Sequence, residues 1–166
     1  MSVKLTQLTL RQWLQGAAAV AVLLSATQAV MPSPAMANPG TLAERSQAAV
    51  EPLLALDAEV ADALQQRSAE RLERAYEALK SKADASSEDS AAGEQATGCD
   101  VAVLNLVIAV GFALNKLDGK ERFEPWMLQE SLSLLDDYHI SAKDCAEDAG
   151  RVGFASKILP ELFETL

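Results

Sequence analysis

Apolar residues in the first half of this chain recur at intervals of three and four, which is the spacing of one face of an α-helix. Thr41 and Glu44 precede this stripe with the Ser/Thr-x-x-Glu spacing of a helix-capping box. Pro52 has no N–H to donate, so a kink or a fresh start is expected there. We therefore predict one long amphipathic helix, or a kinked pair, over residues 41–82. The stripe has one longer interval, across Ser68, and consists of Ala49, Leu53, Leu56, Val60, Leu64, Leu72, Tyr76 and Leu79.

The second half contains a helix-sized stretch that is apolar on nearly every face. Between residues 101 and 117 the non-apolar residues are Asn105, Gly111, Asn115 and Lys116. Its most apolar part, residues 101–114, is shorter than the roughly 20 residues needed to span a bilayer. The stretch is therefore predicted to form the central helix of a bundle.

Two more helices are predicted toward the C-terminus. Residues 118–119 are Asp-Gly, which favours a turn, and Pro125 suits the first position of the next helix because its missing donor is harmless there. Ser141 and Asp144 repeat the capping spacing and predict the start of a last helix, which Pro160 would end or bend.

A polar segment separates the two apolar blocks. Residues 84–98 contain serines, glycines and acids and no large apolar side chain, so we predict a flexible loop. No sustained alternation of period two predicts a strand. The predicted fold class is all-α: a small helical bundle of four or five helices, forming a single domain over residues 38–166.

The first 37 residues have the organisation of a secretory signal peptide. Lys4 and Arg11 precede an apolar run over residues 13–26, and Ala35 and Ala37 give the small-x-small pattern of a cleavage site. We predict cleavage after Ala37 and a periplasmic or secreted mature protein. The alternative is an uncleaved anchor, but the apolar run is too short for a stable membrane span.

The two cysteines predict a disulfide that staples the bundle. Cys99 and Cys145 are an even pair in a chain predicted to enter an oxidising compartment. Each lies near a predicted helix start, so the bridge would join two helix starts. A redox-active pair would favour Cys-x-x-Cys spacing, which is absent. Two free thiols are the remaining alternative.

Charge limits the partners that the mature chain can bind. All 24 acidic residues but only 12 of the 14 basic residues follow Ala37, which gives a formal net charge of −12. Nucleic acid and anionic membranes are disfavoured, because both require a basic face. A basic partner protein is the predicted alternative to an acidic surface that serves solubility alone.

Residues that could carry chemistry are sparse. His139 is the one histidine, and with both cysteines bonded it leaves no ligand set suited to zinc or copper. A pH-sensing role for His139 is the alternative to a structural one. The adjacent acids at 136–137 and 147–148 point about 100° apart on a helix and do not converge. No catalytic motif is present. We therefore predict a non-enzymatic protein with no cofactor and no metal.

Asn105 and Trp126 are the candidate interface or pocket residues. A buried amide is costly unless hydrogen-bonded, so Asn105 would fix helix register, bond the backbone or contact a ligand. Trp126 follows Pro125, and would serve either as a core anchor at the helix start or as an interface hot spot.

The chain resembles small periplasmic acid-stress chaperones of the HdeA type in three places. These are Cys99 with Asp100, the Gly-Phe-Ala-Leu-Asn run at residues 111–115, and Cys145. The resemblance covers residues 97–160 and implies a helical fold with one disulfide and a chaperone activity at acid pH. The predicted helix over residues 41–82 has no counterpart in that family.

These observations predict an exported, non-enzymatic helical protein that binds a partner protein, as an accessory subunit, inhibitor or immunity-type protein. An acid-stress chaperone is the first alternative, because low pH would neutralise the 24 acids and loosen the fold. A carrier of a small apolar ligand held between helices is the second. The oligomeric state stays open.

Overall fold

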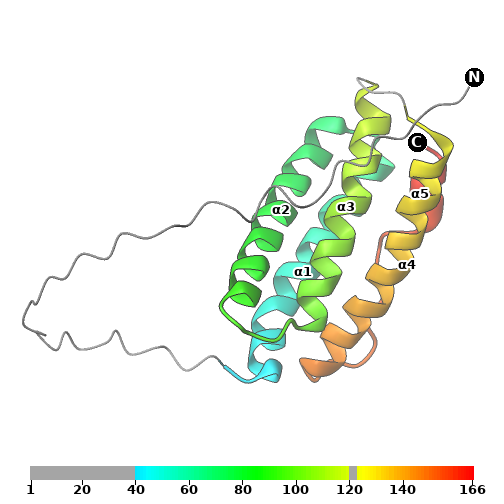
Figure 1. The fold of residues 1–166 in the computed structure, drawn as a ribbon. Helices are drawn as coiled ribbons and strands as arrows, with labels where there is room; N and C mark the ends of the chain where they lie inside the picture. Colours follow the sequence, from blue (N-terminus) through cyan, green and yellow to red (C-terminus); the bar gives the residue numbers. More distant parts are fainter. Residues whose placement is uncertain (1–39, 120–122) are drawn as a thin grey trace, which may run out of the picture. The chain divides into compact units, whose positions relative to one another are not determined.

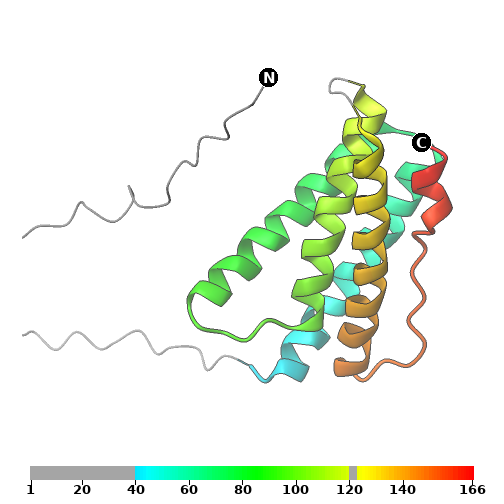
Figure 2. The ribbon, with the colours of Figure 1, turned by 45° about the vertical axis from the view of Figure 1, so that its right-hand side comes forward.

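The computed structural model describes residues 40–119 and 123–166, and within them the chain forms five α-helices and no strand. Four long helices lie side by side and one short helix follows them (Figures 1 and 2). The predicted all-α bundle is confirmed. The predicted signal peptide, residues 1–37, lies outside the described residues. The helices are α1 (Leu42–Gln65), α2 (Ala69–Ala91), α3 (Gly98–Asp118), α4 (Pro125–Asp148) and α5 (Pro160–Glu164).

The first apolar stripe forms two helices, and the break lies after Gln65, not at Pro52. Thr41 and Glu44 form the predicted capping box, in which the Thr41 hydroxyl accepts from the Glu44 amide and the Glu44 carboxylate accepts from the Thr41 amide. Pro52 lies inside α1, where buried residues on both sides of it pack into the core. The chain turns at Arg67, which has a positive φ of 48°, and Ser68 caps α2.

The predicted flexible loop at residues 84–98 is wrong over its first half, because α2 continues to Ala91. The segment lacks large apolar residues, but Ala83, directly before it on the same helix, is buried in the core. The Ser86 hydroxyl also donates to the Asp100 carboxylate of α3 over 2.7 Å. These tertiary contacts offset the entropy of ordering a polar segment. The non-helical connection is residues 92–97.

The predicted helix start at Ser141 is also wrong. Ser141 lies inside α4, and its hydroxyl donates to the main-chain carbonyl of Asp137. α4 ends before Gly150, whose φ of +73° is a conformation that glycine adopts without strain. Residues 149–159 then return along the bundle without regular structure (Figure 2). Pro160 begins α5 and does not end a helix.

The disulfide between Cys99 and Cys145 is present, with 4.7 Å between the two Cα atoms. It joins the first turn of α3 to the last turn of α4, so the prediction that it joins two helix starts is wrong. α3 and α4 make the most extensive contact between any two helices of the described bundle. A Cβ on Gly98 would lie 2.8 Å from the Cys145 nitrogen, so the close approach of the two helices requires glycine. The bridge is consistent with an oxidising compartment.

α3 supplies much of the core but is not enclosed by it. Its buried face consists of Cys99, Ala102, Val103, Leu106, Ala109, Val110 and Ala113. The predicted central helix therefore packs into the core along one face, whereas its opposite face carries exposed apolar side chains. Among the described residues α3 is the helix whose length and composition would allow it to cross a membrane, a property that core helices of water-soluble bundles share.

Candidate functional site

The outward face of α3 is apolar and uncovered. Val101, Leu104 and Ile108 are 40 %, 39 % and 48 % exposed and recur at intervals of three and four, so they lie on one face of the helix. Phe112 is half-buried and lies one turn beyond Ile108. Single exposed apolar residues are ordinary on protein surfaces, but a continuous row of them marks an interaction surface.

Trp126 extends this face onto α4. It follows Pro125, the first residue of α4, and its side chain is 55 % exposed. Its ring meets the ring of Phe112 edge to face, with 5.8 Å between centroids and an interplanar angle of 83°. We define the apolar face as Val101, Leu104, Ile108, Phe112 and Trp126.

Asn105 lies beside the apolar face. It is half-buried and lies one turn from both Val101 and Ile108. No hydrogen bond joins its side chain to another residue in ranges 40–119 and 123–166. The structure therefore places the two sequence-predicted candidates, Asn105 and Trp126, on one surface. Binding by either of them stays a prediction.

A row of acids runs along α4 next to the apolar face. Glu130, Asp137 and Asp144 are exposed and spaced by seven residues, so they share one side of the helix, and Trp126 lies one turn before Glu130 on that side. Trp126 contacts Phe112 near the C-terminal end of α3. At the other end, a Cβ on Gly98 would lie 3.2 Å from the carbonyl carbon of Asp144.

These two contacts show that α4 runs along α3, and the helical spacing puts Glu130, Asp137 and Asp144 on the side of α4 that also carries Trp126. We call these three residues the acidic row. Among the described residues no cation pairs with any of them. Within residues 40–119 and 123–166 the surface thus combines an exposed apolar face with acids that pair with no cation.

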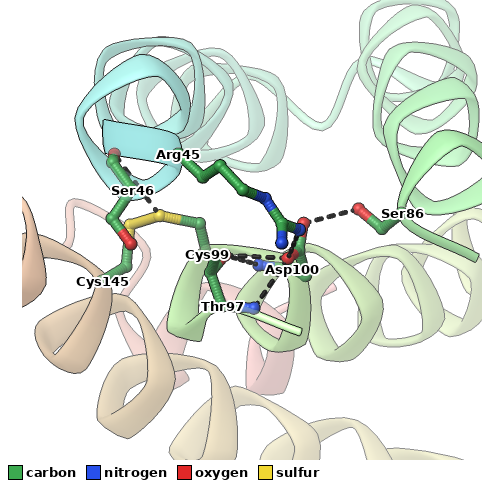
Figure 3. Close-up of a disulfide and its surroundings, with 7 residues drawn as sticks. All are labelled: Arg45, Ser46, Ser86, Thr97, Cys99, Asp100 and Cys145. Carbon is green, nitrogen blue, oxygen red and sulfur yellow. Dashed lines mark hydrogen bonds and ion pairs between the residues drawn. A yellow bond between two sulfur atoms is a disulfide. The ribbon is translucent and has the colours of Figure 1, made fainter. Parts of the chain in front are cut away.

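Asp100 joins three helices at the end of the bundle that carries the disulfide (Figure 3). Its carboxylate accepts hydrogen bonds from the amide and hydroxyl of Thr97 and from the hydroxyl of Ser86, and the Arg45 guanidinium of α1 lies 3.5 Å away. Partial burial acts to raise the pKa of Asp100, but the bonds from Thr97 and Ser86 and the charge of Arg45 outweigh it and lower the pKa below its ordinary value.

We expect Asp100→Asn to lower the free energy of unfolding at pH 7 by about 2 kcal/mol, because hydrogen bonds to a charged group are lost. The folded-state pKa is lowered, so the carboxylate stabilises the fold fully above its unfolded-state pKa of about 3.9 and loses this effect as pH falls through the folded-state value. Urea unfolding of both proteins from pH 7 to pH 2 should show the difference shrinking in acid. A difference that does not change with pH would contradict this account.

Asp57 is a second polar centre, which sequence reasoning missed. Its side chain is 2 % exposed. It accepts from the Tyr138 hydroxyl over 2.7 Å, from the Lys157 amide over 2.7 Å and from the Ser156 hydroxyl. Burial, the charge of Asp57 and the hydrogen bond to it raise the pKa of Tyr138, which keeps the phenol protonated as the donor. The sequence signal that could have indicated this site is the position of Asp57, an acid directly after Leu56 of the apolar stripe.

His139 also holds the segment that returns along the bundle. Its Nε2 atom lies at hydrogen-bond distance, 3.0 Å, from the carbonyl oxygen of Ile158. Together with Asp57 it fixes residues 156–158 against α1 and α4, which gives both side chains a structural role.

The described residues offer little for a metal or a small ligand. They contain no group of three or more His, Cys, Asp or Glu side chains that could hold a metal ion. A cavity of about 180 Å³ lies between α1, α2 and α3 beside Cys99. This cavity is smaller than the roughly 300–1,000 Å³ of ligand pockets. A larger hollow of about 370 Å³ is lined by the charged side chains of Glu59, Asp62, Arg71 and Arg74, so neither one favours a carrier of a small apolar ligand.

Comparison with known proteins found no matching family model, no similar curated protein and no similar solved structure. The resemblance to HdeA-type chaperones stays a prediction from the sequence. The functional argument therefore rests on the apolar face and the acidic row.

Proposed function

We propose that this chain is an exported, non-enzymatic protein that binds a basic partner protein through the apolar face and the acidic row. The observation that carries the proposal is their adjacency: an uncovered row of apolar side chains runs beside exposed acids that no described cation neutralises. Large contiguous apolar patches on a protein surface commonly mark interaction sites.

Each part of the surface has a distinct physical task in this proposal. Burial of the apolar side chains supplies affinity, with about 25 cal/mol gained for each Å² removed from water. Trp126 has the size and the exposed edge of a hot-spot residue. The acidic row attracts a basic partner and sets its orientation, which acts mainly on the association rate and on specificity.

We expect Ile108→Glu to abolish retention of the partner. A tagged protein exported with its own N-terminus and purified from the cell envelope would be used as bait against envelope extract. One stoichiometric partner should be retained at low salt, released at high salt and absent with Ile108→Glu. Val152→Glu is the matched control, because Val152 is another exposed apolar residue (102 %) and lies in the 149–159 segment, away from α3. Equal retention by both variants, or the absence of any partner, would overturn the proposal.

An acid-stress chaperone is the second candidate, and Asp100 is the observation that favours it. The bonded carboxylate of Asp100 links α1, α2 and α3, and its lowered pKa means that acid weakens this link. A chaperone of this kind should bind a hydrophobic dye reversibly at pH 2–3 and not at pH 7. A fold that stays compact and dye-free at pH 2 would exclude this candidate.

A further inference from the structure

The apolar face and the acidic row lie on two long helices that run side by side (Figures 1 and 2), which limits the shape of a partner segment that can cover both. The face runs over 12 residues from Val101 to Phe112, and the 11 steps between them span about 16 Å at 1.5 Å per residue. The acidic row follows the neighbouring helix, whose axis in packed helices is about 8–10 Å away. The surface is therefore a shallow strip between two antiparallel helices, and it matches a rod of three turns or more.

The described part of the protein favours a helix over other peptide conformations. An extended peptide gains its affinity from main-chain bonds to a sheet edge, and residues 40–119 and 123–166 contain no strand. A polyproline segment needs a groove lined by aromatic rings, whereas Phe112 and Trp126 lie together at one end of the strip. A helix forms its own backbone hydrogen bonds, so it needs no sheet edge. It also presents side chains at intervals of three and four residues, which is the spacing of the exposed apolar residues on α3.

Charge decides between a second copy of this chain and a different protein. A second copy would bring another chain of formal net charge −12 (residues 38–166) against the acidic row. Like charges brought together in this way cost free energy. A helix with Lys or Arg on the side that faces α4 would instead pair with Glu130, Asp137 and Asp144, which have no cation partner among the described residues.

We infer that the partner presents a cationic amphipathic α-helix, which lies along α3 with its apolar residues on the apolar face and its basic residues toward α4. This inference rests on the proposed function and adds the chemical class of the partner segment. The expected pattern is apolar residues at positions i, i+3 or i+4, i+7 and i+11, with Lys or Arg along one flank.

Trp126 provides a direct readout, because it is the one tryptophan in residues 38–166; the other of the chain's two tryptophans is Trp13. The probe is a tryptophan-free peptide of 18 residues, built from Leu and Lys in an amphipathic helical pattern. Titration into the exported protein should shift the Trp126 emission to the blue and saturate at one peptide per chain. Circular dichroism should show the bound peptide becoming helical. A scrambled peptide of identical composition should bind at least about tenfold more weakly.

Two sets of variants connect binding to the two features. Ile108→Glu should lower the affinity for the peptide about tenfold or more, whereas Val152→Glu should leave the affinity unchanged. The triple variant Glu130→Gln, Asp137→Asn, Asp144→Asn should lose most of the salt dependence of binding. The control for the triple variant removes three exposed acids elsewhere, by Glu88→Gln, Glu161→Gln and Glu164→Gln. This control variant should keep the salt dependence of binding. Unchanged thermal unfolding would show that each variant is folded.

The outcomes separate this inference from the proposed function. If the patterned and scrambled peptides bind equally, or neither binds, the helical class of partner is wrong. In that case retention of an envelope protein that depends on Ile108 would keep the proposed function. Loss of both the peptide and the envelope protein would overturn both proposals.

Discussion

Replacing Asp57 with alanine is expected to lower the free energy of unfolding by about 3–5 kcal/mol, since buried donors then lose their acceptor. The three donors come from two parts of the chain: the Tyr138 hydroxyl of α4, and the Ser156 hydroxyl and Lys157 amide of the returning segment. Urea unfolding at pH 7, followed by circular dichroism, measures the loss. Hydrogen exchange should show residues 156–158 losing protection before the helices do.

Asp62→Ala is the matched control for Asp57→Ala. Asp62 lies on the same helix and pairs with Arg71, but its side chain is about half exposed. An exposed ion pair contributes about 0–1 kcal/mol, so this variant should unfold nearly as the wild type does. Tyr138→Phe, which removes a single bond to Asp57, should give an intermediate loss. If Asp57→Ala and Asp62→Ala cost the same, the buried network does not hold the returning segment.

Removing the disulfide is the other change with a large expected effect. A bridge between residues 46 apart contributes about 4 kcal/mol in the chain-entropy model, so Cys99→Ser with Cys145→Ser should lower stability by about that amount. Both sulfurs are buried between α3 and α4, which adds the loss of their packing. The urea midpoint of the wild type under strong reductant should approach that of the double variant. A midpoint unaffected by reduction would contradict the prediction.

The same change should also affect the proposed binding surface. The bridge holds the first turn of α3 against the last turn of α4, where the acidic row ends at Asp144. Without it the apolar face and the acidic row would be free to move relative to each other at that end. We therefore expect weaker partner binding even under conditions in which the reduced protein stays folded.

The sequence by itself determined the fold class and several helix starts, because local interactions decide these. The capping box at Thr41 and the proline at position 125 mark helix starts in the structure. Each depends on atoms within one helical turn, so the residues alone were sufficient. The disulfide also followed from the sequence, since a chain that is predicted to be exported and has two cysteines leaves a single pairing.

Tertiary structure decided the helix lengths and which apolar residues form the proposed binding surface. Residues 84–91 continue α2 beyond the buried Ala83, and Ser86 bonds Asp100, a partner 14 residues away on another helix. The sequence indicated Trp126 and Asn105 as candidate interface or pocket residues. It could not distinguish the exposed apolar residues of α3 from the buried ones. α3 is apolar on nearly every side, so only the positions of α1, α2 and α4 determine which of its faces stays in water.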